Sequence, residues 1–311
     1  MTDIILHHYP TSPFSEKIRL IFGYKKLAWK SVIIPSIMPK PDVVALTGGY
    51  RKTPFMQIGA DIYCDSTLIC DHLEKIETQP SLYPPSIDGT ARIVAQWADT
   101  TLFWAAMGHN LSAKGAAQLF AGAPQEALKA FGEDRGKMRG GMVRLSPADA
   151  TAAYTVYLSR LAAMLERTPH LLGAEPSVAD FAAYHPLWFT RTCVPVMADI
   201  LQATPRVLTW MDKMASIGHD KSETFNATDA IALAARSIPL PITPNSFQDQ
   251  HSIPVGSSVC IAAESFGDET SEGELLSVAA NEYIVRRHDQ RAGTVHVHFP
   301  RVGYVLKMVT T

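Results

Sequence analysis

"YPTSPFSEKIRL", residues 9–20, is the stretch that decides how the first part of the chain folds. It follows the apolar run "DIILHH", so a strand is expected to pass directly into a helix. Pro13 suits the first position of a helix, which makes Ser12 the predicted N-cap. In that role the Ser12 hydroxyl satisfies one free backbone N–H. Ser15 is then expected to be an exposed residue of the first turn.

The same helix start also offers a place for chemistry. The N-terminus of a helix presents unpaired N–H donors and a partial positive charge, and both stabilise a nearby anion such as a thiolate. A cysteine at position 12 would itself be that thiolate, whereas the hydroxyl of Ser12 stays protonated near neutral pH. Ser12 can instead donate a hydrogen bond to a thiolate that a ligand brings. It is therefore either a structural cap or the contact of an external thiol.

The composition and the spacing of apolar residues divide the 311 residues into three parts. Residues 1–80 run strand–helix–strand–helix–strand–strand–helix, which predicts a small α/β sheet domain. Residues 88–236 are rich in alanine and have a helical period, so an all-helical domain is expected after a proline-rich linker. Within residues 250–311, five short alternating runs predict a small all-β domain of the SH3-like barrel kind.

The composition excludes several classes of protein. Hydrophobic residues make up 47% and charged residues 19%, as in soluble globular proteins. A net charge of -2 creates no long-range field for nucleic acid or an anionic membrane. No apolar run approaches the roughly 18 residues of a membrane span, and the first ten residues lack the pattern of a secretory signal. The cysteines form no C-x-x-C pair, so we expect buried thiols in a reducing, cytoplasmic compartment. They are Cys64, Cys70, Cys193 and Cys260.

Two further segments carry residues suited to holding a peptide. "RKTPFMQI", residues 51–58, places Thr53 and Pro54 at the start of a strand, where proline need not join a ladder. A cis bond there would leave the Thr53 backbone free to pair with an extended peptide. "CDSTLICDHL" places Asp65 and Ser66 just before a helix, a second N-terminus that could face a carboxylate. Taken singly, each is also an ordinary strand-edge proline or helix cap.

Taken together, the three segments resemble the glutathione-binding domain of the cytosolic glutathione S-transferases. "SPFSEKIRL", then "TPF" about forty residues later and "DST" about a dozen further on, stand in the order of that family. The helical part, whose "SVADF" forms a capping box from Ser177 to Asp180, is similar as well. The resemblance covers residues 1–236. It implies a thioredoxin-like first domain, an all-helical second domain and a homodimer.

The resemblance also implies where glutathione would bind. The γ-glutamyl end would meet Asp65 and Ser66. The cysteine backbone would pair with Thr53, before a cis Pro54, and the thiol would point at Ser12. Glutathione is thus the expected co-substrate.

Two of these roles have competing candidates. Lys40 is the expected partner of the glycine carboxylate, and Lys52 is its alternative. Tyr9 is the alternative to Ser12 as the donor to the thiol, although strand alternation is expected to turn it elsewhere.

The family resemblance implies a modest chemistry with two alternatives. An enzyme of this kind lowers the pKa of the glutathione thiol and holds a small apolar electrophile nearby, either to conjugate or to reduce it. The electrophile pocket would lie between the domains, lined by Tyr9, Phe14, Trp104 and residues 112–145, while Trp97 would belong to the core. Alternatively, the protein is a non-catalytic binding or regulatory protein whose β domain engages a partner.

The last part of the chain is rich in histidine. His296 and His298 share one face of a strand, and His288 lies nearby. Without cysteines or a fixed spacing, this set predicts a polar outer face, with Val295 and Val297 inside, rather than a metal site. Scattered arginines are offset by acidic residues, so nucleic acid is an unlikely partner. The tail is expected to pack on the helical domain or to serve as an interaction module.

Overall fold

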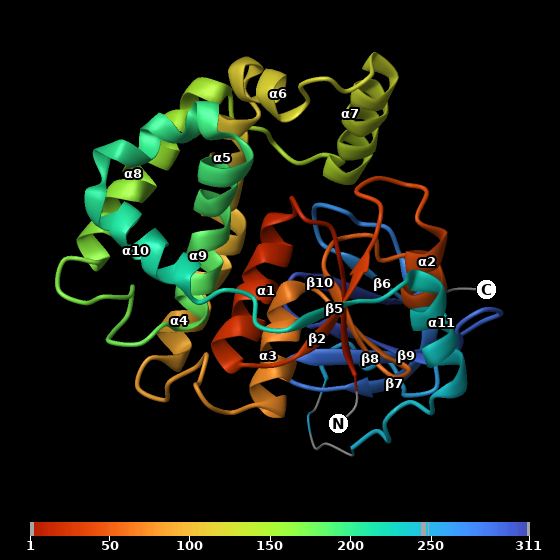
Figure 1. Cartoon of the computed structure of the whole chain (residues 1–311). Coiled ribbons are helices and arrows are strands. Elements are labelled where there is room, and N and C mark those ends of the chain that lie inside the picture. Colours follow the sequence, from red (N-terminus) through yellow and green to blue (C-terminus); the bar gives the residue numbers. More distant parts are fainter. Residues whose placement is uncertain (1–2, 244–246, 248, 310–311) are drawn as a thin grey trace.

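The computed structural model describes residues 3–243, 247 and 249–309, and its first domain has the predicted order of elements (Figure 1). This order is thioredoxin-like. The elements are β1 (Ile4–His8), α1 (Pro13–Lys25), β2 (Trp29–Ile33), α2 (Pro41–Thr47), β3 (Phe55–Ile58), β4 (Asp61–Cys64) and α3 (Ser66–Ile76).

The start of α1 follows from its local sequence. Ser12 is the N-cap, with φ -76° and ψ 119°, and Pro13 occupies the first turn. The Ser12 Oγ accepts a hydrogen bond from the Ser15 backbone N–H at 3.2 Å. The predicted cap is therefore confirmed. The exposed position expected for Ser15 is wrong, because the rest of the chain covers this first turn and buries the side chain completely.

Helices α4 to α10 form the second domain, as predicted (Figure 1). The segment 112–145, which lacked a clear pattern, forms α6 and α7 at the top of that view. The helices are α4 (Asp88–Trp97), α5 (Phe103–Asn110), α6 (Ala113–Leu119), α7 (Gln125–Arg139), α8 (Pro147–Met164), α9 (Val178–Trp188) and α10 (Pro205–Ser216). Two π-helical turns, Ala98–Leu102 and Phe189–Cys193, and a 3-10 segment, Pro195–Ala203, complete the domain.

The capping box predicted at the start of α9 is confirmed. Both of its reciprocal hydrogen bonds, between Ser177 and Asp180, are present. Asp180 is completely buried, and its carboxylate also accepts from Leu171 N–H at 2.8 Å and from Trp210 Nε1 at 3.0 Å. One side chain thus caps α9 and ties it to α10.

After α10 the chain returns to the first domain. Strand β5 (Ser222–Thr224) pairs in parallel with β2, and helix α11 (Ala227–Arg236) packs against α2 and β9. The Trp29 Nε1–H donates to the carbonyl of His219 at 2.9 Å and fixes this return. Residues 222–236 therefore add to the layers of the first domain, although their sequence pattern matches the preceding helices.

The strand-rich tail is confirmed, and its sheet continues that of the first domain. Within the described ranges one sheet runs in the order β10-β6-β7-β8-β9-β4-β3-β1-β2-β5, with β9 parallel to β4. The tail thus joins the sheet of the thioredoxin-like domain through β4, and the loop between β6 and β7 also contacts the helical domain, as was expected of the tail. Its strands are β6 (Ser258–Ala263), β7 (Ser271–Val278), β8 (Glu282–Asp289), β9 (Gly293–Pro300) and β10 (Tyr304–Met308).

The alternation predicted along β9 is half confirmed. Val295 and Val297 are completely buried in the core, as expected. His296 and His298 are also buried, with 9% and 5% of their surfaces exposed, so the predicted polar outer face is wrong. Pairing with β4 brings this face of β9 next to Tyr63 and α3, which exclude solvent.

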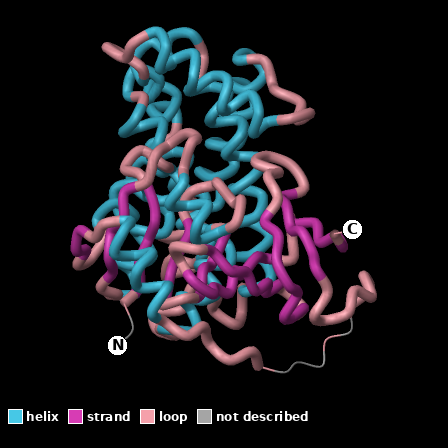
Figure 2. Tube along the Cα trace, turned by 90° about the vertical axis from the view of Figure 1, so that its right-hand side faces the viewer, coloured by secondary structure: helices cyan, strands magenta, loops and turns pink. Residues whose placement is uncertain are grey.

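The sheet separates two layers of helices. Helices α1 and α3 pack between one face and the helical domain, while α2 and α11 cover the other face. Figure 2 shows helices and loops alone in the upper part of the molecule, and the strands, with further helices among them, in the lower part. Among the described residues, no helix combines the length and the apolar character that crossing a bilayer requires.

Candidate functional site

The three segments singled out in the sequence lie at one end of the sheet. Strand β3 is antiparallel to both β1 and β4, with His7 opposite Phe55 and Phe55 opposite Cys64. The end of β1, the start of β3 and the end of β4 are therefore adjacent. Each leads into a candidate segment: the turn to Ser12, the Thr53–Pro54 bond and the start of α3.

Ser12 lies almost completely buried, with 1% of its surface exposed. Its backbone N–H donates to the carbonyl of Tyr9 at 3.1 Å, which fixes the turn between β1 and α1. Because Oγ accepts from Ser15 N–H, the hydroxyl proton of Ser12 is left for another acceptor. An anion there would also gain from the positive end of the α1 dipole.

The Tyr9 hydroxyl reaches the same place. Burial raises the pKa of Tyr9, and the neighbouring Arg135 guanidinium and Ser12 hydroxyl only partly offset the rise. Tyr9 is therefore a neutral phenol near neutral pH and can donate a hydrogen bond. The expectation that Tyr9 points away from Ser12 is wrong, because it follows the last residue of β1 and is not bound by the alternation of the strand.

Thr53 presents free backbone groups at the start of β3. The Thr53–Pro54 peptide bond is cis, as the family resemblance implied. The ladders of β3 begin at Phe55, and within the described part of the chain no backbone partner bonds the N–H or C=O of Thr53. An extended peptide could therefore pair with Thr53 as a strand would.

The two candidate lysines have different partners. Lys40 is 2% exposed, and its Nζ donates to the Arg51 carbonyl at 3.1 Å and to Thr53 Oγ1 at 3.4 Å. Burial, together with the nearby Arg135 and Arg51, lowers the pKa of Lys40 to about 8. Among the described residues no carboxylate pairs with Lys40, so it has capacity for an incoming anion.

Lys52 is held near the opposite segment. Its Nζ lies 3.7 Å from Asp65 Oδ2 and 4.6 Å from the centre of the Tyr304 ring. An ammonium above an aromatic face is stabilised by the charge distribution of the ring. These contacts turn Lys52 toward Asp65 and leave Lys40 as the lysine beside Thr53.

Asp65 is the N-cap of α3 and adopts an uncommon positive φ of 76°. Its Oδ1 accepts from Thr67 N–H at 3.0 Å, and its own N–H donates to the Tyr50 hydroxyl at 3.0 Å. The Tyr304 hydroxyl of β10 donates to Oδ2 at 2.9 Å. Sequence reasoning missed Tyr304, because nothing local to β10 indicates a contact with residue 65.

Ser66 connects this segment to a buried ion pair. Its hydroxyl accepts from Lys17 Nζ at 3.4 Å, and the same ammonium lies 2.6 Å from Asp99 Oδ2. His185 Nε2 lies 2.9 Å from the other oxygen of Asp99. Burial alone would lower the pKa of Lys17, but the carboxylate of Asp99 outweighs burial and raises it. Lys17 is therefore a fixed cation beside the start of α3.

Aromatic rings connect α1 to the helical domain and to the tail. Phe14 lies 4.8 Å from Phe103, which lies 4.9 Å from Trp104, measured between ring centres. Phe266, in the loop between β6 and β7, continues this row with its ring 5.0 Å from that of Trp104. Trp97 instead packs against Tyr157, in agreement with its predicted place in the core.

Helix α7 and the loop between β6 and β7 close over this end of the sheet. Arg51 pairs with Asp134 of α7 and, at 2.7 Å, with Glu269 of the loop. The Gly267 N–H donates to the carbonyl of Met138 at 2.7 Å, which joins the loop to α7. The sequence indicated residues 112–145 as a border of the site, but it gave no sign that the tail also contributes.

Three of the four cysteines of the chain are poor nucleophiles. All four are free. Burial raises the pKa of Cys70 to about 12 and that of Cys193 to about 11, and it raises the pKa of Cys64 well above its usual range. These three thiols stay protonated near neutral pH. A reactive sulfur at Ser12 would therefore have to come from a ligand.

The fold is that of the glutathione S-transferases. The glutathione S-transferase N-terminal domain matches residues 6–81, and the C-terminal domain matches residues 148–213. A GST-like protein from Pseudomonas syringae is 39% identical, with 99% of this chain and 100% of that chain covered and a TM-score of 0.83. The chain therefore belongs to the glutathione S-transferase family, and the similarity to the P. syringae protein includes the tail.

Two other relatives match over a smaller share of the chain. FtsZ-localized protein A of Caulobacter vibrioides (strain NA1000 / CB15N) is 26% identical over 184 residues, which are 57% of this chain and 73% of that protein. A glutathione S-transferase from Rhodospirillum rubrum F11 is 18% identical, with coverage of 68% of this chain and 88% of that chain and a TM-score of 0.51. The latter likeness is one of fold.

Proposed function

We propose that this protein binds glutathione at the end of the sheet where Ser12, Thr53 and Asp65 meet. The observation that carries the proposal is the unpaired backbone of Thr53 beside the cis Pro54. It lies between a helix N-terminus suited to a thiolate and a second N-terminus suited to a carboxylate. A tripeptide with a thiol in its middle residue matches that order of groups.

Each end of the tripeptide has a partner of opposite charge. The γ-glutamyl carboxylate faces the start of α3 at Ser66, beside the Lys17 ammonium, and the γ-glutamyl amine faces the Asp65 carboxylate. The glycine carboxylate pairs with Lys40, which is buried beside Thr53 and has no carboxylate partner among the described residues. Lys52 is the less suitable candidate because it already lies against Asp65.

The thiol of the bound glutathione faces Ser12. A hydrogen bond from Ser12 and the dipole of α1 stabilise the thiolate, which lowers the pKa of the thiol and raises the fraction of nucleophile. The thiolate then attacks a small apolar electrophile. In conjugation a bond to sulfur forms while a leaving group departs with its electron pair, or while a double bond takes up the electron pair and a proton. In reduction a second glutathione attacks the sulfur of the first, and the two leave as the disulfide. Tyr9 is a second donor at the same place, and we assign it to the pocket wall with Phe14 and Trp104.

A binding or regulatory role is the second candidate function. The relative named FtsZ-localized protein A is known by where it localises, and its name records no reaction. The closure of the site by α7 and the β6–β7 loop also suits a protein that holds its ligand. In this alternative the tail engages a partner, and the same glutathione contacts are kept.

Calorimetric titration with glutathione and rate measurements on a panel of generic electrophiles test these proposals. We expect Ser12→Ala to lower the rate of thiol transfer by about 10- to 100-fold, since one hydrogen bond to a charged group contributes about 1.5–3 kcal/mol. Ser15→Ala, a change of a buried hydroxyl in the same turn, is the matched control and should leave the rate nearly unchanged. Tyr9→Phe measures the contribution of the other donor.

The outcomes separate the alternatives. Binding without turnover of any electrophile, together with no effect of Ser12→Ala, would replace the enzyme by the binding protein. Absence of glutathione binding would refute the site itself. We also propose a cytoplasmic homodimer, as in related transferases, and light scattering during gel filtration measures the mass that decides the oligomeric state.

A further inference from the structure

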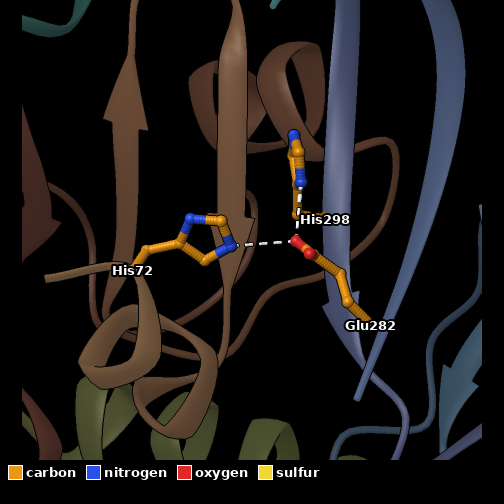
Figure 3. Close-up of side chains that lie close together, drawn as sticks. All are labelled: His72, Glu282 and His298. Atoms are coloured by element: carbon orange, nitrogen blue, oxygen red, sulfur yellow. Dashed lines mark hydrogen bonds and ion pairs between the residues drawn. The ribbon is translucent and has the colours of Figure 1, made fainter. Parts of the chain in front are cut away.

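A second cluster of polar side chains lies where the tail joins the first domain. His72 comes from α3, Glu282 is the first residue of β8, and His298 lies on β9, as Figure 3 shows. Both histidines point at the same carboxylate (Figure 3). His72 Nε2 is 2.9 Å and His298 Nδ1 is 2.8 Å from Glu282 Oε1, and the three ligand atoms lie within 4.8 Å of one another.

His298 is held from its other side by a second carboxylate. Its Nε2 lies 3.1 Å from Asp61 Oδ1, and Asp61 is 1% exposed. The other oxygen of Asp61 accepts from Leu240 N–H at 2.9 Å. The ring of His298 also stacks on Tyr63, with 4.4 Å between centres. The orientation of the His298 imidazole is therefore fixed before any ligand arrives.

This cluster carries an excess negative charge. Both partners of His298 are carboxylate oxygens, so both of its ring nitrogens donate and the ring is an imidazolium. His72 has one carboxylate contact, from Nε2 to Glu282, so a single N–H serves it and the ring is neutral. One imidazolium beside Asp61 and Glu282 leaves one unbalanced negative charge. The cation that acts on His72, Lys75 of the same helix, has an exposed side chain.

We propose that His72, Glu282 and His298 bind a divalent transition metal, with zinc as the best fit. Two imidazoles and one carboxylate are a donor set that zinc favours. On binding, His298 releases the proton on Nδ1, and His72 keeps its single proton by moving it to Nδ1. The charge of the cluster with the metal is then zero, since two carboxylates balance one divalent cation. This removes the unbalanced buried charge of the metal-free state.

Asp61 supports the proposed site as a positioning residue. A histidine that binds a metal through one nitrogen usually donates its other N–H to a carboxylate, which fixes the ring and makes it a better ligand. The Asp61–His298 contact already has this form. Tetrahedral zinc with bonds of about 2.0–2.1 Å needs its ligands about 3.3 Å apart. The His72 side chain is 15% exposed, so solvent reaches this ligand, and we assign the fourth position to a water.

Calorimetric titration of Zn²⁺ into the untagged, chelator-treated full chain tests the proposal. We expect one ion per chain and the release of about one proton, measured by repeating the titration in buffers of different ionisation enthalpy. Co²⁺ in place of zinc should give the visible absorption of a tetrahedral site. His72→Gln should lower the affinity for zinc at least 100-fold, and Asp61→Asn by about 10- to 100-fold.

His288→Gln is the matched control, since His288 is an exposed histidine on the same strand as Glu282. It should bind zinc as the unmodified protein does. His72 is partly exposed on α3, so its variant is expected to fold, and an unchanged circular dichroism spectrum checks this. Unchanged zinc affinity in a folded His72→Gln variant, or no binding by the unmodified protein at micromolar zinc, would overturn the proposal. Neither result depends on whether glutathione binds.

Discussion

Raising the pH through 8 is expected to weaken the binding of S-methylglutathione, an analogue of glutathione whose sulfur carries a methyl group. The reason is that Lys40 loses its positive charge over this range. Burial and two neighbouring arginines lower the pKa of this ammonium from 10.5 to about 8 in the free protein. A bound glycine carboxylate favours the ammonium and raises the pKa again. Binding therefore takes up a proton above pH 8, so affinity is highest below pH 8 and falls above it.

The size of the effect follows from the two pKa values. If the carboxylate restores the pKa of Lys40 to its usual value, this pKa rises by about 2.5 units on binding. The rise corresponds to a largest possible change in affinity of a factor of about 300. The dissociation constant should rise about 10-fold by pH 9 and about 70-fold by pH 10, relative to pH 7. The Lys40→Met variant should bind S-methylglutathione up to about 300-fold more weakly at neutral pH, since its side chain has no positive charge at any pH.

The assay is calorimetric titration from pH 6 to about 10, with Lys40→Arg as the reference variant. S-methylglutathione has no thiol to titrate. The arginine variant keeps its positive charge throughout, so the pH dependence of its affinity reports the titration of the ligand's own amine. The ratio of the two dissociation constants isolates Lys40. A ratio that stays within about twofold across this range would refute the pairing of Lys40 with the carboxylate.

Three other substitutions test contacts described above by urea unfolding and hydrogen exchange. Asp99→Asn should lower the free energy of unfolding by about 3–5 kcal/mol, because it leaves the Lys17 ammonium buried without a counter-charge; a loss below about 1 kcal/mol would contradict this. Tyr304→Phe should lower the free energy of unfolding by about 1–3 kcal/mol, because the hydrogen bond to Asp65 is lost. An unchanged free energy of unfolding would show that Lys52 replaces this hydrogen bond to Asp65. Val297→Ala should cost about 2 kcal/mol and speed exchange of β1 amides, whereas unchanged exchange would mean that the tail unfolds separately.

The sequence predicted those helix starts and strands that are determined by residues close to one another in the chain. The N-cap Ser12 with Pro13, and the capping box of Ser177 with Asp180, each act within one helical turn, so the printed sequence contains the whole interaction. The order of strands and helices in residues 1–80 followed from the period of the apolar residues in the same way. The candidate segments around Thr53 and Asp65 were found because each lies at the end of a regular element.

Contacts between distant segments were beyond this kind of reasoning. Alternation on β9 correctly put Val295 and Val297 on one face. It could not tell whether water or α3 would cover His298 on the other. The same pattern predicts a strand equally well in a closed barrel or in an extension of another sheet, and the partner of β9 is β4. The hydrogen bond from Tyr304 to Asp65 spans 239 positions and has no local signature.

The parallel pairing of β4 with β9 also bears on when the protein can fold during synthesis. Asp61 and His298 lie 237 positions apart, yet their strands are neighbours in the sheet. Until residues 293–300 have left the ribosome, this side of β4 remains an unpaired edge with free N–H and C=O groups. Closing so long a loop slows folding, and the waiting edge can pair with other nascent chains. The nascent protein therefore has reason to depend on chaperones until the strands of residues 258–308 have been made.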